Sequence, residues 1–171
     1  MTARTIHPAM LAERDLLVQC EMGKTRTSGP GGQHRNKVET GVILTHTPTG
    51  IEARAGERRS VTENKRVAIR RLRLALATEH RMLVPLGEIR TSLWIERSRG
   101  GTISCNVEHW DFPALIAEAL DVAWACEADV SRAAARLAVT SSQLLKLIKE
   151  HPLAWQHLKA WRAERGLPTL R

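Results

Sequence analysis

Residues 28–36, "SGPGGQHRN", hold the residue types in this sequence that are best suited to chemistry. Gly31 and Gly32 have no side chains, so the main-chain N–H groups at positions 32 and 33 can approach a crowded polar centre. Gln33 supplies a hydrogen-bond donor and an acceptor, but its neutral amide cannot serve as a general base. This combination favours positioning of a reactant and stabilisation of an oxyanion. Composition alone favours a glycine-rich turn without chemistry, and only the surrounding residues overturn that interpretation.

The neighbouring residues do not complete a nucleotide-binding motif. A P-loop ending in the Gly-Lys-Thr of residues 23–25 would need glycine at position 18, which is Val18. A GxGxxG motif that begins at Gly29 would need glycine at position 34, which is His34. The seven histidines lack metal-ligand spacing to carboxylates or cysteines. We therefore expect neither a metal ion nor a cofactor.

The charge of the chain is concentrated in one segment. The net charge is +8, and residues 24–99 hold 16 basic and 7 acidic side chains, whereas residues 100–171 hold 8 of each. A concentrated basic surface most often binds a polyanion, and nucleic acid is the favoured partner. A solvated face that only confers solubility is the alternative.

Short strands are expected to position the glycine-rich segment. Alternation of apolar and polar residues predicts a strand over residues 16–22, directly before it. After it, the segments 41–47 and 51–55 flank Pro-Thr-Gly at residues 48–50, a pattern that predicts a β-hairpin. The small sheet is therefore expected to be mixed or antiparallel.

A helix of about twenty residues is expected next, starting at a capping box of Ser60 and Glu63. Its apolar residues recur at helical spacing and are Val61, Ala68, Ile69, Leu72 and Leu76. Three arginines share the opposite face, namely Arg66, Arg70 and Arg73. One face of the helix should therefore pack on the sheet while the arginines face solvent.

The rest of the chain differs in composition and predicts a second domain. Residues 81–111 are interpreted as a linker that contains at most a short strand at 103–107. Helices are expected over 112–126, 129–138, 141–150 and 152–164. Within residues 133–149, a break at Val139-Thr140 gives the outline of a helix-turn-helix. The expected fold class is α+β, with domains at 1–80 and 112–171 joined by the linker.

No run of eighteen apolar residues and no signal sequence is evident. We therefore expect a cytoplasmic location and no membrane partner. Cys20, Cys105 and Cys126 are interpreted as buried thiols, because their number is odd and their spacing wide. A monomer is expected.

Residues 24–77 resemble the catalytic domain of bacterial class I peptide chain release factors and of related ribosome-rescue hydrolases. The resemblance rests on three motifs in order: Ser28, Gly29 and Gly31 to Lys37 in the frame S-G-x-G-G-Q-H-x-N-K; T-x-x-P-T-G at 45–50; and Glu57, Arg58, Ser60, Asn64 and Lys65 at the entry to the basic helix. In size the chain is closest to the codon-independent rescue hydrolases.

The resemblance implies that the loop enters the ribosomal peptidyl-transferase centre and hydrolyses the ester of peptidyl-tRNA. Gly31, Gly32 and Gln33 would be the catalytic residues, and the loop would be supported by Ser28, Gly29, His34 and Asn36. The contacts to rRNA or tRNA phosphates would come from Arg26, Arg35, Lys37, Arg58, Arg59, Lys65, Arg66, Arg70 and Arg73. The resemblance also implies that Gln33 can be N-methylated, as the corresponding glutamine can be in relatives, so a glutamine methyltransferase is a further expected partner.

The chain also departs from the family. About fifteen residues precede the first expected strand, which leaves no room for a stop-codon-reading domain, and residues 100–171 are not the basic tail of known rescue hydrolases. The preferred hypothesis is that the helical domain recognises a stalled ribosome through Lys146, Lys149, Lys159 and Arg162.

A packing domain with Trp124, Trp155 and Trp161 in its core is the equal alternative. Two other functions stay open: a non-catalytic RNA- or ribosome-binding protein that keeps the fold, and, less favoured, a helix-turn-helix nucleic-acid-binding regulator.

Overall fold

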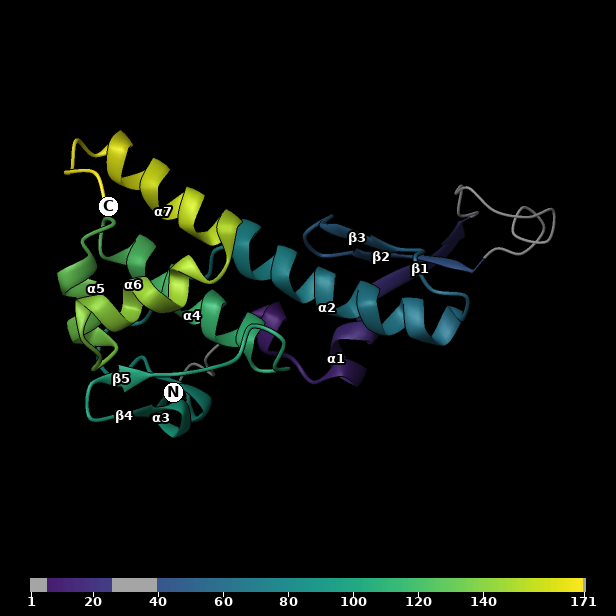
Figure 1. Ribbon diagram of the computed structural model, residues 1–171, viewed down its shortest axis with the longest axis horizontal. Coiled ribbons are helices and arrows are strands. Elements are labelled where there is room, and N and C mark those ends of the chain that lie inside the picture. The colour runs from purple at the N-terminus through teal and green to yellow at the C-terminus, as the bar shows by residue number, and fades with distance from the viewer. Residues whose placement is uncertain (1–5, 26–39, 171) are drawn as a thin grey trace. The chain divides into compact units, whose positions relative to one another are not determined.

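The computed structural model describes residues 6–25 and 40–170. The chain divides into two compact units, Met1–Glu79 and His80–Arg171, which are described separately (Figure 1). The first unit combines helices with a three-stranded sheet, and the second is mainly helical, so the expected α+β class is confirmed. Within the described residues, no helix is both long and apolar enough to cross a membrane.

The sheet of the first unit is antiparallel, with strand order β1-β2-β3. These strands are Cys20–Thr25, Gly41–His46 and Glu52–Ala55. The β-hairpin of β2 and β3 is confirmed, and Gly50 adopts a φ of 72° in its turn, a conformation that favours glycine. The buried His46 secures this turn, because its ring contacts the Thr49 hydroxyl at 2.7 Å and the Gln19 amide oxygen at 3.0 Å.

The helix α2 (Val61–Glu79) packs along one face of the sheet (Figure 1). Ser60 directly precedes it, and the Ser60 hydroxyl accepts a hydrogen bond from the Glu63 N–H at 3.5 Å, as the capping box predicts. The apolar stripe is buried against β2 and β3 through Ala68, Ile69, Leu72 and Leu76 on the helix and Val42, Leu44, Ala53 and Ala55 on the strands. Burial of each large side chain contributes about 1.5–3 kcal/mol, so this layer holds the unit together.

The expected strand over residues 16–22 is partly wrong. Residues Glu13–Val18 form the short helix α1, and β1 begins only at Cys20. The strand pattern would place Leu16 and Val18 on one side, but Leu16 is fully buried while Val18 is 81% exposed. A helical turn separates these two side chains, because residues two apart do not share a helix face.

The expected solvent-facing position of Arg73 is also wrong. Arg73 is only 2% exposed, and its Nε donates a hydrogen bond of 3.0 Å to the carbonyl of Ala9. Ala9 belongs to the short 3-10 helix η1 (Pro8–Met10), which contacts α2. Helical periodicity could not show that an N-terminal segment covers this part of α2.

The second unit includes the segment 81–111, which had been expected to be a linker. This segment contains the helix α3 (Ser92–Arg97) and a two-stranded hairpin of β4 (Ser98–Arg99) and β5 (Thr102–Ile103). The side chain of Trp94 on α3 is completely buried, and its indole N–H donates to the carbonyl of Leu137 at 2.9 Å. Such packing makes the segment part of a folded unit.

The centre of the second unit is α4 (Phe112–Ala125), whose residues 112–123 are all buried. Two acidic side chains on this helix are paired. Glu118 accepts hydrogen bonds from the N–H and the hydroxyl of Thr91, and Asp121 forms an ion pair of 2.8 Å with Arg81. These partners satisfy the buried carboxylates and join the segment before α3 to α4.

The three remaining helices lie close to their expected positions: α5 (Val130–Arg136), α6 (Ser141–Lys149) and α7 (Pro152–Glu164). Thr140 is the N-cap of α6, and its hydroxyl accepts from the Gln143 N–H at 3.2 Å. The Thr140 N–H donates to the carbonyl of Gly101 at 2.9 Å, so the β4–β5 hairpin supports the start of α6.

The N-cap of α7 makes stability depend on pH. The His151 Nδ1 accepts a hydrogen bond from the Ala154 N–H at 3.3 Å, and burial lowers the pKa of His151 below its ordinary value. The unfolded chain therefore binds more protons than the folded chain just below pH ~6.5, and folding stability falls as the pH falls through that range.

We expect His151→Asn to keep a capping oxygen while it removes this contribution. Urea denaturation between pH ~7.5 and ~5.5 should show a smaller loss of stability for His151→Asn than for the unchanged chain. Equal losses in the two proteins would contradict the role of His151.

Candidate functional site

The residues with the strongest sequence signal lie outside the described residues. This holds for the predicted catalytic residues Gly31, Gly32 and Gln33. It also holds for seven others, which are Arg26, Ser28, Gly29, His34, Arg35, Asn36 and Lys37. What the structure does describe is the framework from which this segment starts and to which it returns.

The segment 26–39 leaves and re-enters the fold at one end of the sheet. Thr25, the last residue of β1, pairs with Gly41, the first residue of β2. At the same end, Val42 pairs with Ala55, the last residue of β3. Residues 56–60, which lead into α2, therefore start beside the two ends of the segment 26–39.

Asn64 joins these neighbouring segments. Its side chain is completely buried, and its Nδ2 donates to the carbonyls of Thr40 at 2.7 Å and Arg58 at 2.9 Å. Its Oδ1 accepts from the Arg58 N–H at 2.9 Å. One amide thus holds the residue that follows the segment 26–39 and the turn that precedes α2. A carboxylate or an apolar side chain of similar size could not make all three hydrogen bonds.

A second contact holds the same turn from outside. Arg71 on α2 forms an ion pair of 2.7 Å with Glu57 and donates to the carbonyl of Arg54 at 2.7 Å. The pKa of the Glu57 carboxyl is below its usual value, first because the Gly56 N–H donates to it and also because Arg71 is near. Arg71 thus balances the negative charge of Glu57. The other charged side chains named at this end of the sheet, Arg58 and Arg59, are positive.

The structure separates the six predicted RNA-contacting residues that it describes into three groups. Arg58, Arg59 and Arg66 are exposed, Lys65 and Arg70 are half-buried, and Arg73 is buried. Arg58 and Arg59 lie beside the ends of the segment 26–39, where long cationic side chains can reach the phosphates of a substrate.

Sequence reasoning missed Lys24 and Asn64 as parts of this site. Lys24 is exposed and pairs with Val42 in the register of β1 and β2, so it lies at the same end of the sheet as Arg58. The sequence offered no signal for Lys24, because the expected strand ended at residue 22, whereas β1 extends to Thr25. The three hydrogen bonds of Asn64 are a tertiary feature, and only its place in a recognised motif pointed to it.

The described part of the site offers cations and main-chain groups rather than an acid–base pair. Over residues 6–25 and 40–170, no cluster of three or more histidine, cysteine or carboxylate side chains is arranged to hold a metal ion. The arrangement can bind phosphates and present the segment 26–39 from a rigid base.

Comparison with known protein families decides what this framework is. Residues 15–85 match the family model of the RF-1 domain. The chain contains an RF-1 domain. The match covers α1 from Asp15 onward, the whole three-stranded sheet and α2, and it includes the segment 26–39.

Relatives of the RF-1 domain carry release-factor names. The chain is 42% identical over 82 residues to the chloroplastic peptide chain release factor PrfB1 of Arabidopsis thaliana, which is 47% of this chain and 17% of that protein. It is 42% identical over 69 residues to peptide chain release factor 1 of Thermotoga maritima, which is 39% of this chain and 20% of that protein.

It is also 51% identical over 51 residues to peptide chain release factor 2 of Variovorax paradoxus, which is 30% of this chain and 14% of that protein. The chain thus spans about a fifth or less of the length of each of these relatives.

The hydrogen bonds of Asn64 give a prediction for the RF-1 domain. We expect Asn64→Ala to lower the free energy of unfolding by about 2–4 kcal/mol, because it leaves buried main-chain groups of Thr40 and Arg58 without their partner. Urea denaturation measures this change. Thr62→Ala, an exposed change two residues earlier in α2, is the control and should alter stability by less than about 0.5 kcal/mol. Similar values for both variants would refute the role of Asn64.

Proposed function

We propose that this protein catalyses ribosome-dependent hydrolysis of the ester bond in peptidyl-tRNA, and that it does so without recognising a stop codon. The observation that carries the proposal is the sequence Gly31-Gly32-Gln33 within an RF-1 domain. The relatives of this domain are named peptide chain release factors, so a release-type reaction is the function that best fits it.

The reaction adds water to the carbonyl carbon of the ester. The carbonyl oxygen gains negative charge, and collapse of the intermediate frees the peptide acid and the 3′-hydroxyl of the tRNA, which takes a proton from the attacking water. In this proposal the main-chain N–H of Gln33 donates to the developing oxyanion, and the Gln33 side chain shapes the pocket that admits water. Gly31 and Gly32 allow the backbone to come close enough.

The basic residues of the first unit would hold it on ribosomal RNA and peptidyl-tRNA. Residues 1–79 contain 14 lysines and arginines against 8 aspartates and glutamates. Lys24, Arg58 and Arg59 surround the ends of the segment 26–39, so we assign them the nearest phosphate contacts. Arg66, Lys65 and Arg70 lie farther along α2 and would make contacts at longer range.

Independence from the stop codon is the finer part of the proposal. The support for it is the second unit, which lies almost entirely beyond residue 85, where the match to the RF-1 domain ends. We propose that this unit contributes to selection of the ribosome. A glutamine methyltransferase that acts on Gln33, a monomeric state and a cytoplasmic location are parts of the same proposal.

Variants of the segment 26–39 test the chemistry. We expect Gly32→Ala to slow peptide release from ribosomes that carry peptidyl-tRNA by at least about 100-fold, because a β-carbon would displace the oxyanion donor. Gln33→Ala should have a smaller effect, because its main-chain N–H remains.

His34→Ala tests whether the neighbouring imidazole acts as a general base. A general base contributes about 100-fold or more to a rate, so retention of activity within about threefold would exclude that role for His34. If the unchanged protein binds ribosomes but releases no peptide, a non-catalytic ribosome-binding function replaces the proposal.

The state of the mRNA tests codon independence. Release is compared on ribosomes with a stop codon, with a sense codon and with no mRNA in the A site. We expect release without a stop codon, with no more than about threefold stimulation by one, since a lost codon contact would change the rate by far more. A strict requirement for a stop codon would refute this part and leave the hydrolysis itself standing.

A further inference from the structure

One indole ring of the second unit lies against two lysine side chains. The ammonium nitrogen of Lys149 is 4.8 Å from the centre of the Trp155 ring, and that of Lys159 is 5.7 Å from it. We propose that these three residues, the Trp155 cluster, form a binding site for an unpaired segment of RNA, with a base stacked on the indole and phosphates between the lysines.

The cluster is built at the junction of two helices. Lys149 is the last residue of α6, and Trp155 lies in the first turns of α7. Lys159 follows Trp155 by four residues, the spacing at which side chains on a helix are neighbours. The cap at His151 and the packing of α6 against α7 keep these elements together. The indole is thus presented by a rigid junction rather than by a loop.

Burial and charge in the cluster suit a ligand. Both lysines are exposed and the indole is half-buried, so part of the cluster's surface reaches solvent. Both ammonium groups lie near one ring, so an anion bound beside that ring would be attracted by both of them. Aromatic rings next to cationic side chains are the usual means of binding single-stranded nucleic acid, because every base can stack and every nucleotide carries a phosphate.

Two neighbouring arginines make contacts within the unit, so we do not assign them to the site. Arg162, expected to contact the ribosome, donates to the carbonyls of Ala128 at 2.7 Å and Pro168 at 2.9 Å. Arg165 pairs with Glu127 at 2.8 Å and lies over the Trp124 ring at 4.6 Å. Both arginines thus hold the C-terminal part of the unit in place.

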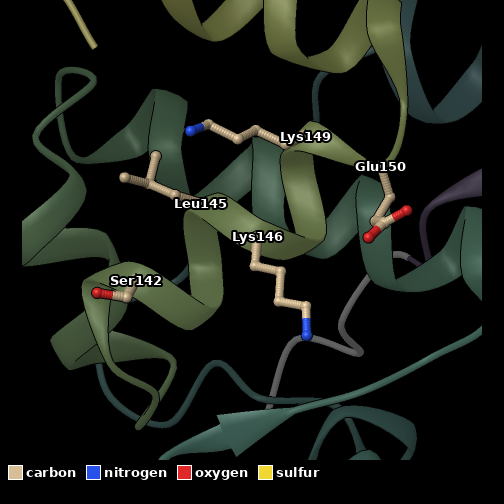
Figure 2. Close-up of a pocket in the computed structure, with 5 residues that line it drawn as sticks. All are labelled: Ser142, Leu145, Lys146, Lys149 and Glu150. Carbon is tan, nitrogen blue, oxygen red and sulfur yellow. The ribbon is translucent and has the colours of Figure 1, made fainter. Parts of the chain in front are cut away.

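Lys146 offers an internal comparison. A shallow hollow on α6 is lined by Ser142, Leu145, Lys146, Lys149 and Glu150. Figure 2 shows the side chains of Lys146 and Lys149 leaving α6 in different directions, and it is Lys149 whose ammonium nitrogen lies over the Trp155 ring. It therefore serves as a control for general loss of positive charge.

The choice of RNA over DNA rests on the proposed function, because lysine and indole contacts do not distinguish the sugars. On the ribosome, the cluster would give the second unit its own contact with exposed rRNA or tRNA. Binding to an oligonucleotide needs no ribosome and no hydrolysis. Its failure is therefore distinguishable from failure of the release reaction, which is measured separately.

The test uses the full chain and a fluorescein-labelled single-stranded RNA of about 12 nucleotides, a length within the usual footprint of such sites. We expect the double variant Lys149→Ala/Lys159→Ala to weaken binding at least about fivefold near 50 mM salt, and to reduce the slope of log K against log salt by about 1.4. The matched control Lys146→Ala/Arg132→Ala, which removes two exposed charges from the same unit, should bind within about twofold of the unchanged chain.

Trp155→Phe reports stacking. Binding of unlabelled RNA should quench tryptophan fluorescence of the unchanged chain, and the quenching should be largely lost in this variant, which retains a ring for packing. Equal weakening in both double variants, or undiminished quenching in Trp155→Phe, would overturn the proposal. A preference for single-stranded DNA of the same sequence would also overturn the assignment to RNA.

Discussion

The layer between α2 and the strands β2 and β3 is the contact on which the candidate site depends. Leu44 and Leu72 are completely buried in it, and their burial fixes α2 along the sheet. Only with α2 in that place can the Asn64 amide reach Thr40 on one side and Arg58 on the other. Burial of the apolar layer stabilises this contact. The hydrogen bonds of the buried amide then fix the backbone of Thr40 and Arg58 beside the ends of the segment 26–39.

The arginines of α2 show that one residue type serves three purposes on one helix. Arg73 is buried and holds the N-terminal segment through the carbonyl of Ala9. Arg71 holds the turn before α2 through Glu57. Arg66 is exposed and available to a polyanion. Positive net charge predicts an RNA partner for this unit, but it does not reveal that Arg71 and Arg73 are engaged within the protein.

The second unit is organised around a buried helix whose two carboxylates are paired, Glu118 with Thr91 and Asp121 with Arg81. Such pairs are costly to break, because a lone buried charge would remain. They connect residues 81–91 to α4 and explain why this stretch is part of a folded unit. The same unit leaves Lys149, Trp155 and Lys159 together at its surface, which a unit with a packing role alone would not require.

Local patterns by themselves determined the chemically distinctive segment 28–36, the β-hairpin, the capped helix α2 and the four helices after residue 112, because each depends on residues close together in sequence. Tertiary structure decided the rest. The short helix α1 replaced an expected strand because Leu16 enters the core while Val18 does not. The side chains of Arg73 and Arg162 donate hydrogen bonds to the carbonyls of Ala9 and Ala128, which are far from them in sequence. Asn64 is the central polar residue of the candidate site because folding brings Thr40 and Arg58 close to its side chain. The spacing of these residues along the chain does not predict that contact.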